Sequence, residues 1–326
     1  MAAPEDPPHV EAQRRIARGR SQVPALPALL RRPRHLAGRR RRAALVDPGG
    51  RRPRSGTTWL GDVVAALAGW PLLHEPTHTH KVPELRDGHG WDGRPFREPL
   101  EADPELAADL EQLLTGRYLG PGLVPRSRAM DAALWARRPM VSKVIDVNLM
   151  LPWMAHHLPW LRTVHVVRHP LAVVASQEAR TESIWSGMRE IGPPYEHFIA
   201  AHPEYAVPTS YETVAETLVT IWALEHAWLR DRADDLTGLI QLRYEDLRAD
   251  LAAEAPRLAA RLDLPAPSDE LVSQLDRPSR TVNRAASTLG KDAASGWRER
   301  YRGEQLDRLR AILERFDHPF YGPEAL

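Results

Sequence analysis

Short runs of apolar and β-branched residues alternate with longer segments of helical period along this chain, and this alternation limits the fold more than any other feature. Val164–Val167 is a buried-type run followed closely by Pro170, which suits the first turn of a helix. Ala43–Val46, Met140–Ile145 and Leu239–Leu242 are further apolar runs that we expect to be strands. Strands separated by helices predict an α/β domain around a mostly parallel sheet.

The segments between these runs carry the period of amphipathic helices. In Thr57–Trp70 one helical face gathers five apolar side chains: Trp59, Leu60, Val63, Val64 and Leu67. We expect further helices near residues 104–116 and over Leu149–His157, Thr209–Asp231, Asp246–Leu262 and Gly303–Phe316. Residues 74–80 are predicted to form a His-rich turn, and residues 83–104 a loop.

The net charge of +1 hides a strong difference between the start of the chain and its remainder. Residues 1–54 contain fourteen Arg and four acidic residues, a net charge of +10, so residues 55–326 carry −9. Residues 1–42 lack a sustained apolar period, which predicts a disordered or loosely packed arm before one domain at 43–326. Binding of nucleic acid through this arm is disfavoured because the arm lacks interleaved aromatic residues.

Composition excludes several other classes of protein. The chain has no cysteine, so it has neither disulfides nor thiolate metal sites. No apolar stretch is long enough to span a membrane, and the apolar segment Val23–Leu30 is too short and proline-broken for an export signal. We therefore expect a cytoplasmic protein. The sequence leaves its oligomeric state open.

One segment between a predicted strand and a predicted helix is typical of an anion-binding turn. It reads Arg52-Pro53-Arg54-Ser55-Gly56-Thr57-Thr58-Trp59. Small residues before a helix expose backbone N–H groups, and the helix N-terminus adds partial positive charge. Arg54 and two hydroxyls join them, which predicts a phosphate or sulfate site, although an ordinary Arg-rich turn with a helix cap remains the alternative. The segment lacks the Lys of a Walker loop.

This segment resembles the 5′-phosphosulfate loop of sulfotransferases that use 3′-phosphoadenosine 5′-phosphosulfate (PAPS). The resemblance implies that Arg54 stabilises the leaving oxygen, and that the donor is held by Arg54, Ser55, Gly56, Thr57, Thr58 and Trp59. A second family motif, an Arg at a strand end with a Ser eight residues later, grips the 3′-phosphate. Arg168 and Ser176 match it in Val166-Val167-Arg168-His169-Pro170-Leu171-Ala172-Val173-Val174-Ala175-Ser176. Without the resemblance, each would be an ordinary strand-end or helix residue.

Two later segments extend the resemblance over roughly residues 43–326. Leu242-Arg243-Tyr244-Glu245-Asp246-Leu247 resembles a family segment whose Tyr approaches the adenine and whose acids mostly cap a helix. An aromatic strand end with an Asp cap explains this segment equally well. Gly290-Lys291 and Gly296-Trp297-Arg298-Glu299-Arg300 resemble the C-terminal loop that closes over the donor, so that Lys291, Arg298 and Arg300 either reach a phosphate or stay solvated. The implied fold is a three-layer α/β/α domain with a central parallel sheet, of the type shared with P-loop kinases.

Transfer to a hydroxyl needs a base to accept the proton of the acceptor. Cytosolic members carry a Lys-Thr-His pattern after the second strand, whereas here Lys143-Val144-Ile145-Asp146 keeps the Lys but lacks the His. His74-Glu75-Pro76 is similar to the Glu-Pro of carbohydrate-type and many bacterial members. We therefore expect Glu75 to be the catalytic base, with His74, His78 or Asp146 as substitutes; a surface acid at a turn is the plainer interpretation of Glu75.

The same residues spell His-Glu-x-x-His, the pattern of helical zinc proteases, in His74-Glu75-Pro76-Thr77-His78. Pro76 in the middle would break the helix that brings both imidazoles to one face, at a cost of roughly 3 kcal/mol or more. A loop site for a metal at His74, His78 and His80 is a less favoured alternative. We expect no metal.

The sequence therefore predicts a bacterial-type sulfotransferase that moves a sulfuryl group from PAPS to a hydroxyl or amine of a small-molecule or carbohydrate acceptor. A nucleotide-dependent phosphotransferase of the same fold is the alternative, disfavoured by the missing Walker Lys and by the lack of an obvious magnesium-binding Asp. A second alternative is a protein that binds an anionic polymer through the basic arm. One departure concerns Asp47-Pro48-Gly49-Gly50-Arg51-Arg52, which separates the first strand from Pro53, where family members run the strand directly into the loop.

Overall fold

A computed structural model describes residues 43–47, 56–91, 94–118, 139–178, 189–236, 238–276, 296–317 and 321. In this part of the chain five strands form one sheet in the order β2-β3-β1-β4-β5, and every neighbouring pair is parallel. The strands are β1 (Ala43–Asp47), β2 (Leu72–His74), β3 (Met140–Lys143), β4 (Leu161–Val167) and β5 (Leu239–Arg243). The parallel sheet predicted from the alternation is confirmed. The arm predicted at 1–42 lies outside the described residues.

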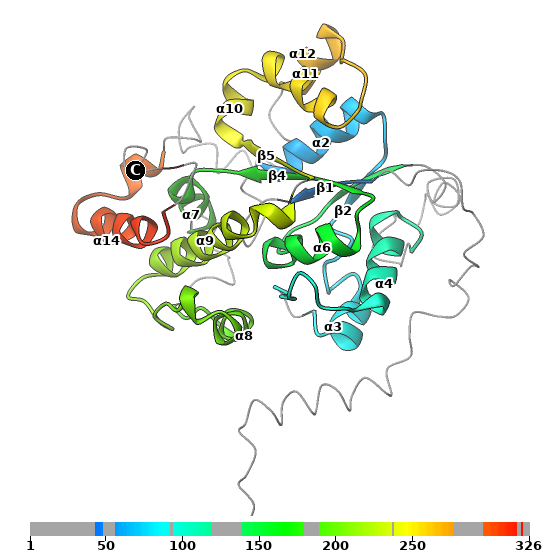
Figure 1. Cartoon of the computed structure of the whole chain (residues 1–326). Helices are drawn as coiled ribbons and strands as arrows, with labels where there is room; N and C mark the ends of the chain where they lie inside the picture. The colour runs from blue at the N-terminus through cyan, green and yellow to red at the C-terminus, as the bar shows by residue number, and fades with distance from the viewer. Residues whose placement is uncertain are drawn as a thin grey trace, which may run out of the picture.

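Helices cover both faces of the sheet (Figure 1). On the upper face in this view lie α2 (Thr57–Ala68), α10 (Tyr244–Ala249), α11 (Leu251–Arg261) and α12 (Asp269–Leu275). On the lower face lie α3 (Pro83–His89), α4 (Pro104–Leu114), α6 (Leu151–His157), α7 (Pro170–Glu178), α8 (Pro193–Ala201), α9 (Val214–Asp231) and α14 (Gly303–Glu314). Short helical turns complete the described residues: η3 (Asn148–Met150), η4 (Pro203–Tyr205), η5 (Ala233–Leu236) and α13 (Trp297–Arg300). The expected three-layer α/β/α architecture is confirmed.

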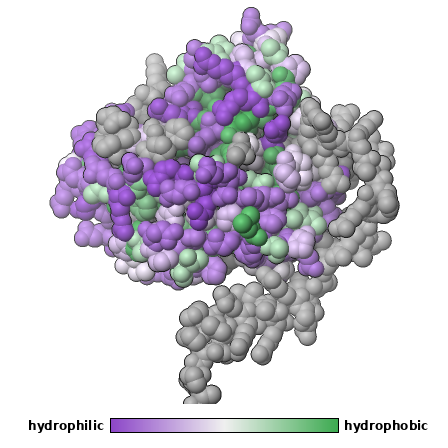
Figure 2. All heavy atoms as spheres, viewed as in Figure 1, coloured by the Kyte–Doolittle hydropathy of each residue, from purple (hydrophilic) through white to green (hydrophobic). Residues whose placement is uncertain are grey.

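Two hydrophobic clusters fill the spaces between the layers. The cluster under α2 contains the predicted face of that helix: Leu60, Val63 and Val64 are fully buried in it, together with Val141 of β3 and Val164 and Val166 of β4. Burial of each such side chain contributes about 1.5–3 kcal/mol relative to its exposed state. The other cluster joins α4, α6, α7, α9 and α14 to the opposite face of the sheet. The outer surface seen in Figure 2 is mostly hydrophilic.

Several predicted boundaries were wrong. Helix α9 begins at Val214 rather than at Thr209, because the Thr213 hydroxyl accepts from the Glu216 backbone N–H while Glu216 accepts from that of Thr213. The helix predicted over 246–262 is two helices, α10 and α11. The break is at Asp250, whose side chain caps α11 by accepting from the Ala253 N–H at 3.0 Å.

The sequence did not predict some of the shortest elements. Strand β2 lies between the predicted helix that ends at Trp70 and the predicted turn at 74–80, with which it shares His74. Helix α3 lies within the predicted loop at 83–104, with Pro83 at its first position. Helices α8, α12 and α13 were also missed. The described part of the chain offers no helix with the length and apolar character needed to cross a bilayer.

Two buried histidines, His226 and His165, lie between α9 and the sheet, and we expect them to make the stability of the fold depend on pH. His226 of α9 and His165 of β4 lie 5.5 Å apart between ring centroids, and both are nearly or fully buried. Burial, together with the charge of Arg94, lowers the pKa of His226 to about 4, although its hydrogen bond to the Trp222 carbonyl opposes the shift. Burial also lowers the pKa of His165 well below its ordinary value.

Because the unfolded chain binds a proton at His226 near pH 6.5 and the native state resists it, stability is lost as pH falls from about 6.5 toward 4. The shift corresponds to about 3 kcal/mol at the acid end of this window. We expect His226→Gln to flatten the decline of urea midpoints between about pH 7 and pH 4.5. His80 is exposed, and His80→Gln is the control. Equal declines of the urea midpoint with pH in the wild type, His226→Gln and His80→Gln would contradict this account.

Candidate functional site

The candidate site lies at the edge of the sheet where all five strands end. Because the strands are parallel, the residues that follow them gather at one edge, on either side of the central β1. From β1 the chain builds β2 and β3 on one side and β4 and β5 on the other (Figure 1). In α/β proteins, ligands bind at the carboxyl ends of the strands where the strand order reverses in this way, and we call this region of the chain the crevice.

The N-terminus of α2 forms one wall of this crevice. Gly56 precedes the helix with a left-handed backbone (φ 86°), and its carbonyl accepts from the Leu60 N–H at 2.9 Å. A methyl group at Gly56 would lie 2.1 Å from Cε2 of Tyr244, so the Tyr244 ring lies directly against the Gly56 backbone. Thr58 is half-buried next to this turn. Arg54, Ser55 and the Thr57 side chain lie outside the described residues.

Gly56 is therefore required both by its backbone angle and by the space that Tyr244 occupies. We expect Gly56→Ala to lower the free energy of unfolding by roughly 3 kcal/mol, from left-handed strain plus overpacking. Gly69 has a similar angle (φ 64°) at the other end of α2 but open space around it. Gly69→Ala should thus cost only about 1 kcal/mol. Urea unfolding of both variants checks this, and equal losses would show that Tyr244 does not constrain Gly56.

Aromatic and cationic side chains stack beside this turn. The Arg168 guanidinium carbon lies 4.8 Å from the Tyr244 ring centroid, and Trp59 meets the same ring edge-on at 6.0 Å. Trp59 is buried, and its indole N–H donates to the Leu275 carbonyl at 3.0 Å. Tyr244, the ring expected to approach the adenine, is half-buried, whereas Trp59 is only 6% exposed.

Arg168 follows the last residue of β4 and is only 6% exposed. Burial lowers the pKa of its guanidinium, which Tyr244, Glu245 and Tyr321 partly offset; an arginine remains charged under these conditions. Helix α7 begins two residues later at Pro170, as predicted, and carries half-buried Ser176 in its second turn. A nearly buried cation and a helix hydroxyl thus lie on the β4 side of the crevice.

The C-terminal segment reaches this same region. The Trp297 ring of α13 stacks on His169 with 4.4 Å between centroids, and the exposed Arg298 lies 4.6 Å from the Trp297 ring. Arg300 instead donates to Glu178 at the end of α7, so it is engaged in an ion pair rather than solvated. Lys291 lies outside the described residues.

Glu75 lies on the other side of β1, where β2 ends beside β3. His74 pairs with Lys143 in the strand register, and the Glu75 N–H donates to the Lys143 carbonyl at 2.7 Å. The Lys143 ammonium, fully buried, donates to Glu75 Oε1 at 2.5 Å. Burial alone would raise the pKa of Glu75, but the charge and hydrogen bond of Lys143 lower it overall. The result is a carboxylate that stays ionised at neutral pH.

Glu75 also has a left-handed backbone (φ 51°), as does Asp146 after β3 (φ 64°). Such angles in residues other than glycine are strained, and they cluster at functional sites. The Asp146 carboxylate accepts from buried Arg94 at 3.0 Å, and Arg94 also pairs with buried Glu225. Asp146 is thus held in a charged network with Arg94 and Glu225.

The histidines around Glu75 do not form the helical zinc motif. His74 ends β2 and residues 76–77 form a turn, as Pro76 predicted. Burial lowers the pKa of both His74 and His78, and His74 Nδ1 lies 3.7 Å from Glu75 Oε1. Within the described ranges, no three His, Asp or Glu side chains gather in a way that could hold a metal ion.

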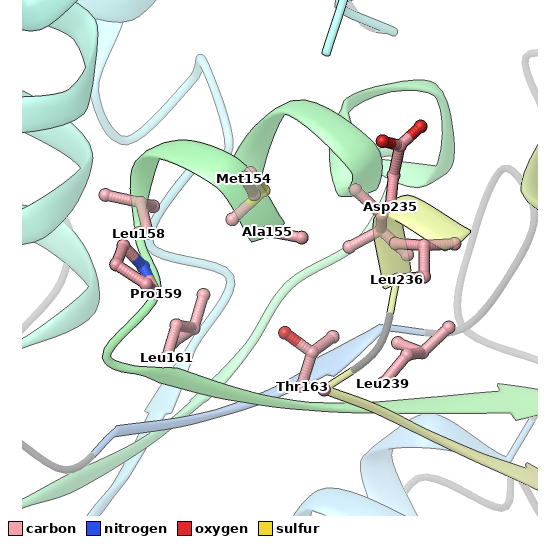
Figure 3. A pocket seen from close by; sticks show the side chains of 11 residues that line it. Met154, Ala155, Leu158, Pro159, Leu161, Thr163, Asp235, Leu236 and Leu239 are labelled. Carbon is pink, nitrogen blue, oxygen red and sulfur yellow. The ribbon is translucent and has the colours of Figure 1, made fainter. Parts of the chain in front are cut away.

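A cavity of about 160 Å³ lies at the opposite edge of the sheet, where β4 and β5 begin (Figure 3). Its walls are mostly apolar and come from α6, η5 and the two strands: Leu151, Met154, Leu158, Leu161, Leu236 and Leu239. The carboxylate of Asp235, at its border, is 2.9 Å from His156 Nε2. The cavity is therefore separate from the charged residues at the carboxyl edge.

Comparison with known proteins agrees with the motifs. A sequence model described as the sulfotransferase family matches residues 52–268. No protein of curated function matches the chain in sequence.

Several solved structures have a similar fold at low sequence identity. A sulfotransferase domain from the curacin biosynthetic pathway is 15% identical, with a TM-score of 0.43, over 85% of this chain and 97% of that one. A mouse sulfotransferase complexed with PAP (adenosine 3′,5′-bisphosphate) is 13% identical, with a TM-score of 0.40; the match covers 85% of this chain and 86% of that one. A retinol dehydratase in complex with androsterone and the inactive cofactor PAP is 19% identical, with a TM-score of 0.41; the match covers 89% of this chain and 84% of that one.

Proposed function

The chain belongs to the sulfotransferase family, and from that premise we propose that it transfers a sulfuryl group from PAPS to a hydroxyl or amine of a small-molecule or carbohydrate acceptor. One geometric observation supports this donor above other nucleotides. The Gly56 turn and the nearly buried Arg168 both meet the Tyr244 ring: the turn lies against its Cδ2–Cε2 edge, and the guanidinium carbon lies over the ring at 4.8 Å from its centroid. A ligand with two anionic groups and an aromatic base between them matches this arrangement.

In this proposal each end of the donor has its own partners. The phosphosulfate lies at the N-terminus of α2, held by backbone N–H groups and by Arg54, Ser55, Thr57 and Thr58. The 3′-phosphate lies on Arg168 and Ser176, and Tyr244 contacts the adenine. Lys291 and Arg298 approach from the C-terminal segment. We propose no metal, because the loop amides and Arg54 stabilise the charge that develops on the leaving oxygen.

Glu75 is the proposed catalytic base. The acceptor oxygen or nitrogen forms a bond to sulfur as the bond between sulfur and the bridging oxygen breaks, which releases adenosine 3′,5′-bisphosphate (PAP). The acceptor proton passes to Glu75. Because Lys143 lowers its pKa, Glu75 accepts the proton best late in the step, when the attacking atom has become acidic. Asp146 is the carboxylate alternative, because it too follows a strand and is held by a buried cation, Arg94, as Glu75 is held by Lys143.

We also expect the protein to act in the cytoplasm.

The proposed reaction is tested by incubating the protein with PAPS and a panel of hydroxyl and amine acceptors, with PAP release and sulfuryl addition followed by mass spectrometry. We expect PAP release that depends on an acceptor, and a sulfated product. Transfer of phosphate from ATP–Mg²⁺, with no product from PAPS, would instead support the phosphotransferase alternative.

A further inference from the structure

Glu245 does not cap a helix, although the sequence suggested that role for the acids of its segment. Its Oε1 accepts from the backbone N–H of His169 at 3.0 Å, across from β5 to the turn after β4. Its other oxygen, Oε2, accepts from the hydroxyl of Tyr321 at 2.5 Å. One carboxylate thus connects the β4 turn to a residue near the end of the chain.

Tyr321 is 4% exposed and is held on several sides. Its hydroxyl also lies 3.4 Å from the Val167 carbonyl, its ring meets His169 edge-on at 5.1 Å, and the Arg243 guanidinium carbon lies 5.0 Å from its centroid. Burial, followed by the charge and hydrogen bond of Glu245, raises the pKa of Tyr321 above its ordinary value. The hydroxyl therefore stays protonated and donates.

Together these contacts bracket Arg168. The carbonyl of Val167, on one side of Arg168, faces the Tyr321 hydroxyl, and the N–H of His169, on the other side, donates to Glu245. Tyr244, over which the Arg168 guanidinium lies, is the residue before Glu245. Both peptide units that flank Arg168 and the ring beneath its side chain are thus fixed by the same pair.

We propose that Glu245 and Tyr321 are positioning residues that set the affinity of Arg168 for the 3′-phosphate of the donor. This inference rests on the proposed function. The Tyr321 hydroxyl meets the Val167 carbonyl and the Glu245 carboxylate, both next to Arg168 in the fold, so its loss should affect the 3′-phosphate more than the 5′ end. A fixed guanidinium loses little freedom when it grips a phosphate, whereas a loosened one must be ordered by the ligand.

The test compares PAP with adenosine 5′-monophosphate (AMP), which lacks the 3′-phosphate, by calorimetry on the full chain. Tyr321→Phe removes one hydroxyl and keeps the ring. We expect it to raise the Kd of PAP about tenfold while the Kd of AMP stays within about twofold, as for loss of one hydrogen bond to a charged group. Glu245→Ala should act in the same direction. In the double variant the Kd of PAP should rise by less than the product of the two single increases, because the two residues act through one another.

Tyr205→Phe is the matched control. It removes a hydroxyl that donates to the carboxylate of Asp231 at 2.6 Å in another part of the lower layer, so it should leave the ratio of the two Kd values unchanged. An unchanged ratio in Tyr321→Phe and Glu245→Ala, in a protein that does prefer PAP, would overturn the positioning role alone. A wild-type protein that binds PAP no more tightly than AMP would overturn the proposed donor and this inference with it.

Discussion

Glu75→Gln should reduce turnover with PAPS at least about 100-fold, because the amide cannot accept the acceptor proton. The substitution keeps the size of the side chain and an oxygen that can accept from Lys143, so the turn after β2 should persist. Binding of PAP should be unchanged, since Glu75 lies on the β2–β3 side of the crevice. Steady-state kinetics and calorimetry on the same preparation check both expectations.

Glu75→Gln also leaves the buried Lys143 ammonium without a charged partner, and breaking a buried ion pair costs about 3–5 kcal/mol of stability. Thermal unfolding must therefore show that the variant is folded at the assay temperature. Glu98→Gln is the control. The Glu98 carboxylate lies 2.8 Å from His202 Nε2 and away from the edge of the sheet where the strands end. Full activity of folded Glu75→Gln would move the base to His74, His78 or Asp146.

Arg168→Ala should weaken PAP about 100-fold, because it removes a nearly buried cation from the proposed 3′-phosphate site. Ser176→Ala should weaken PAP in the same direction but by less, about threefold to tenfold, as for one neutral hydrogen bond. Calorimetry with PAP and with AMP measures both effects. The loss should appear with PAP and be nearly absent with AMP.

Arg162→Ala provides the matched control on the same strand. Arg162 lies at the other end of β4 and forms an exposed ion pair with Asp263. Its removal should therefore leave the affinity for PAP and for AMP unchanged. Arg168→Lys should recover only part of the affinity, because an ammonium lacks the planar fork that grips two phosphate oxygens. Unchanged PAP affinity in both Arg168→Ala and Ser176→Ala would remove the basis for the 3′-phosphate assignment.

The long elements could be predicted from the sequence because they contain enough positions to reveal a period. Helix α2 carries its apolar residues on one face, and all of those predicted to be inside are buried. Strand β2 has three residues and α13 has four, too few to distinguish a helix from a strand. The helix at 246–262 was predicted as one because apolar residues continue past Asp250, while the break depends on the backbone of Asp250 itself.

Local motifs suggested individual candidate residues for the site but not the contacts between distant ones. Gly56 and Arg168 could be proposed because each lies just before a helix within a short, specific pattern. The ion pair between Glu75 and Lys143 joins the ends of two strands, and it becomes visible only when β2 and β3 are known to be neighbours. No local signal around Tyr321 indicates Glu245, since the two residues are 76 positions apart.

The most direct test of the central claim is a calorimetric titration of the wild-type protein with PAP, with AMP and with ATP–Mg²⁺. The account predicts one PAP bound per chain, tighter than AMP because of the contacts of the 3′-phosphate with Arg168, and no requirement for metal. Tight binding of ATP–Mg²⁺ without binding of PAP would contradict it.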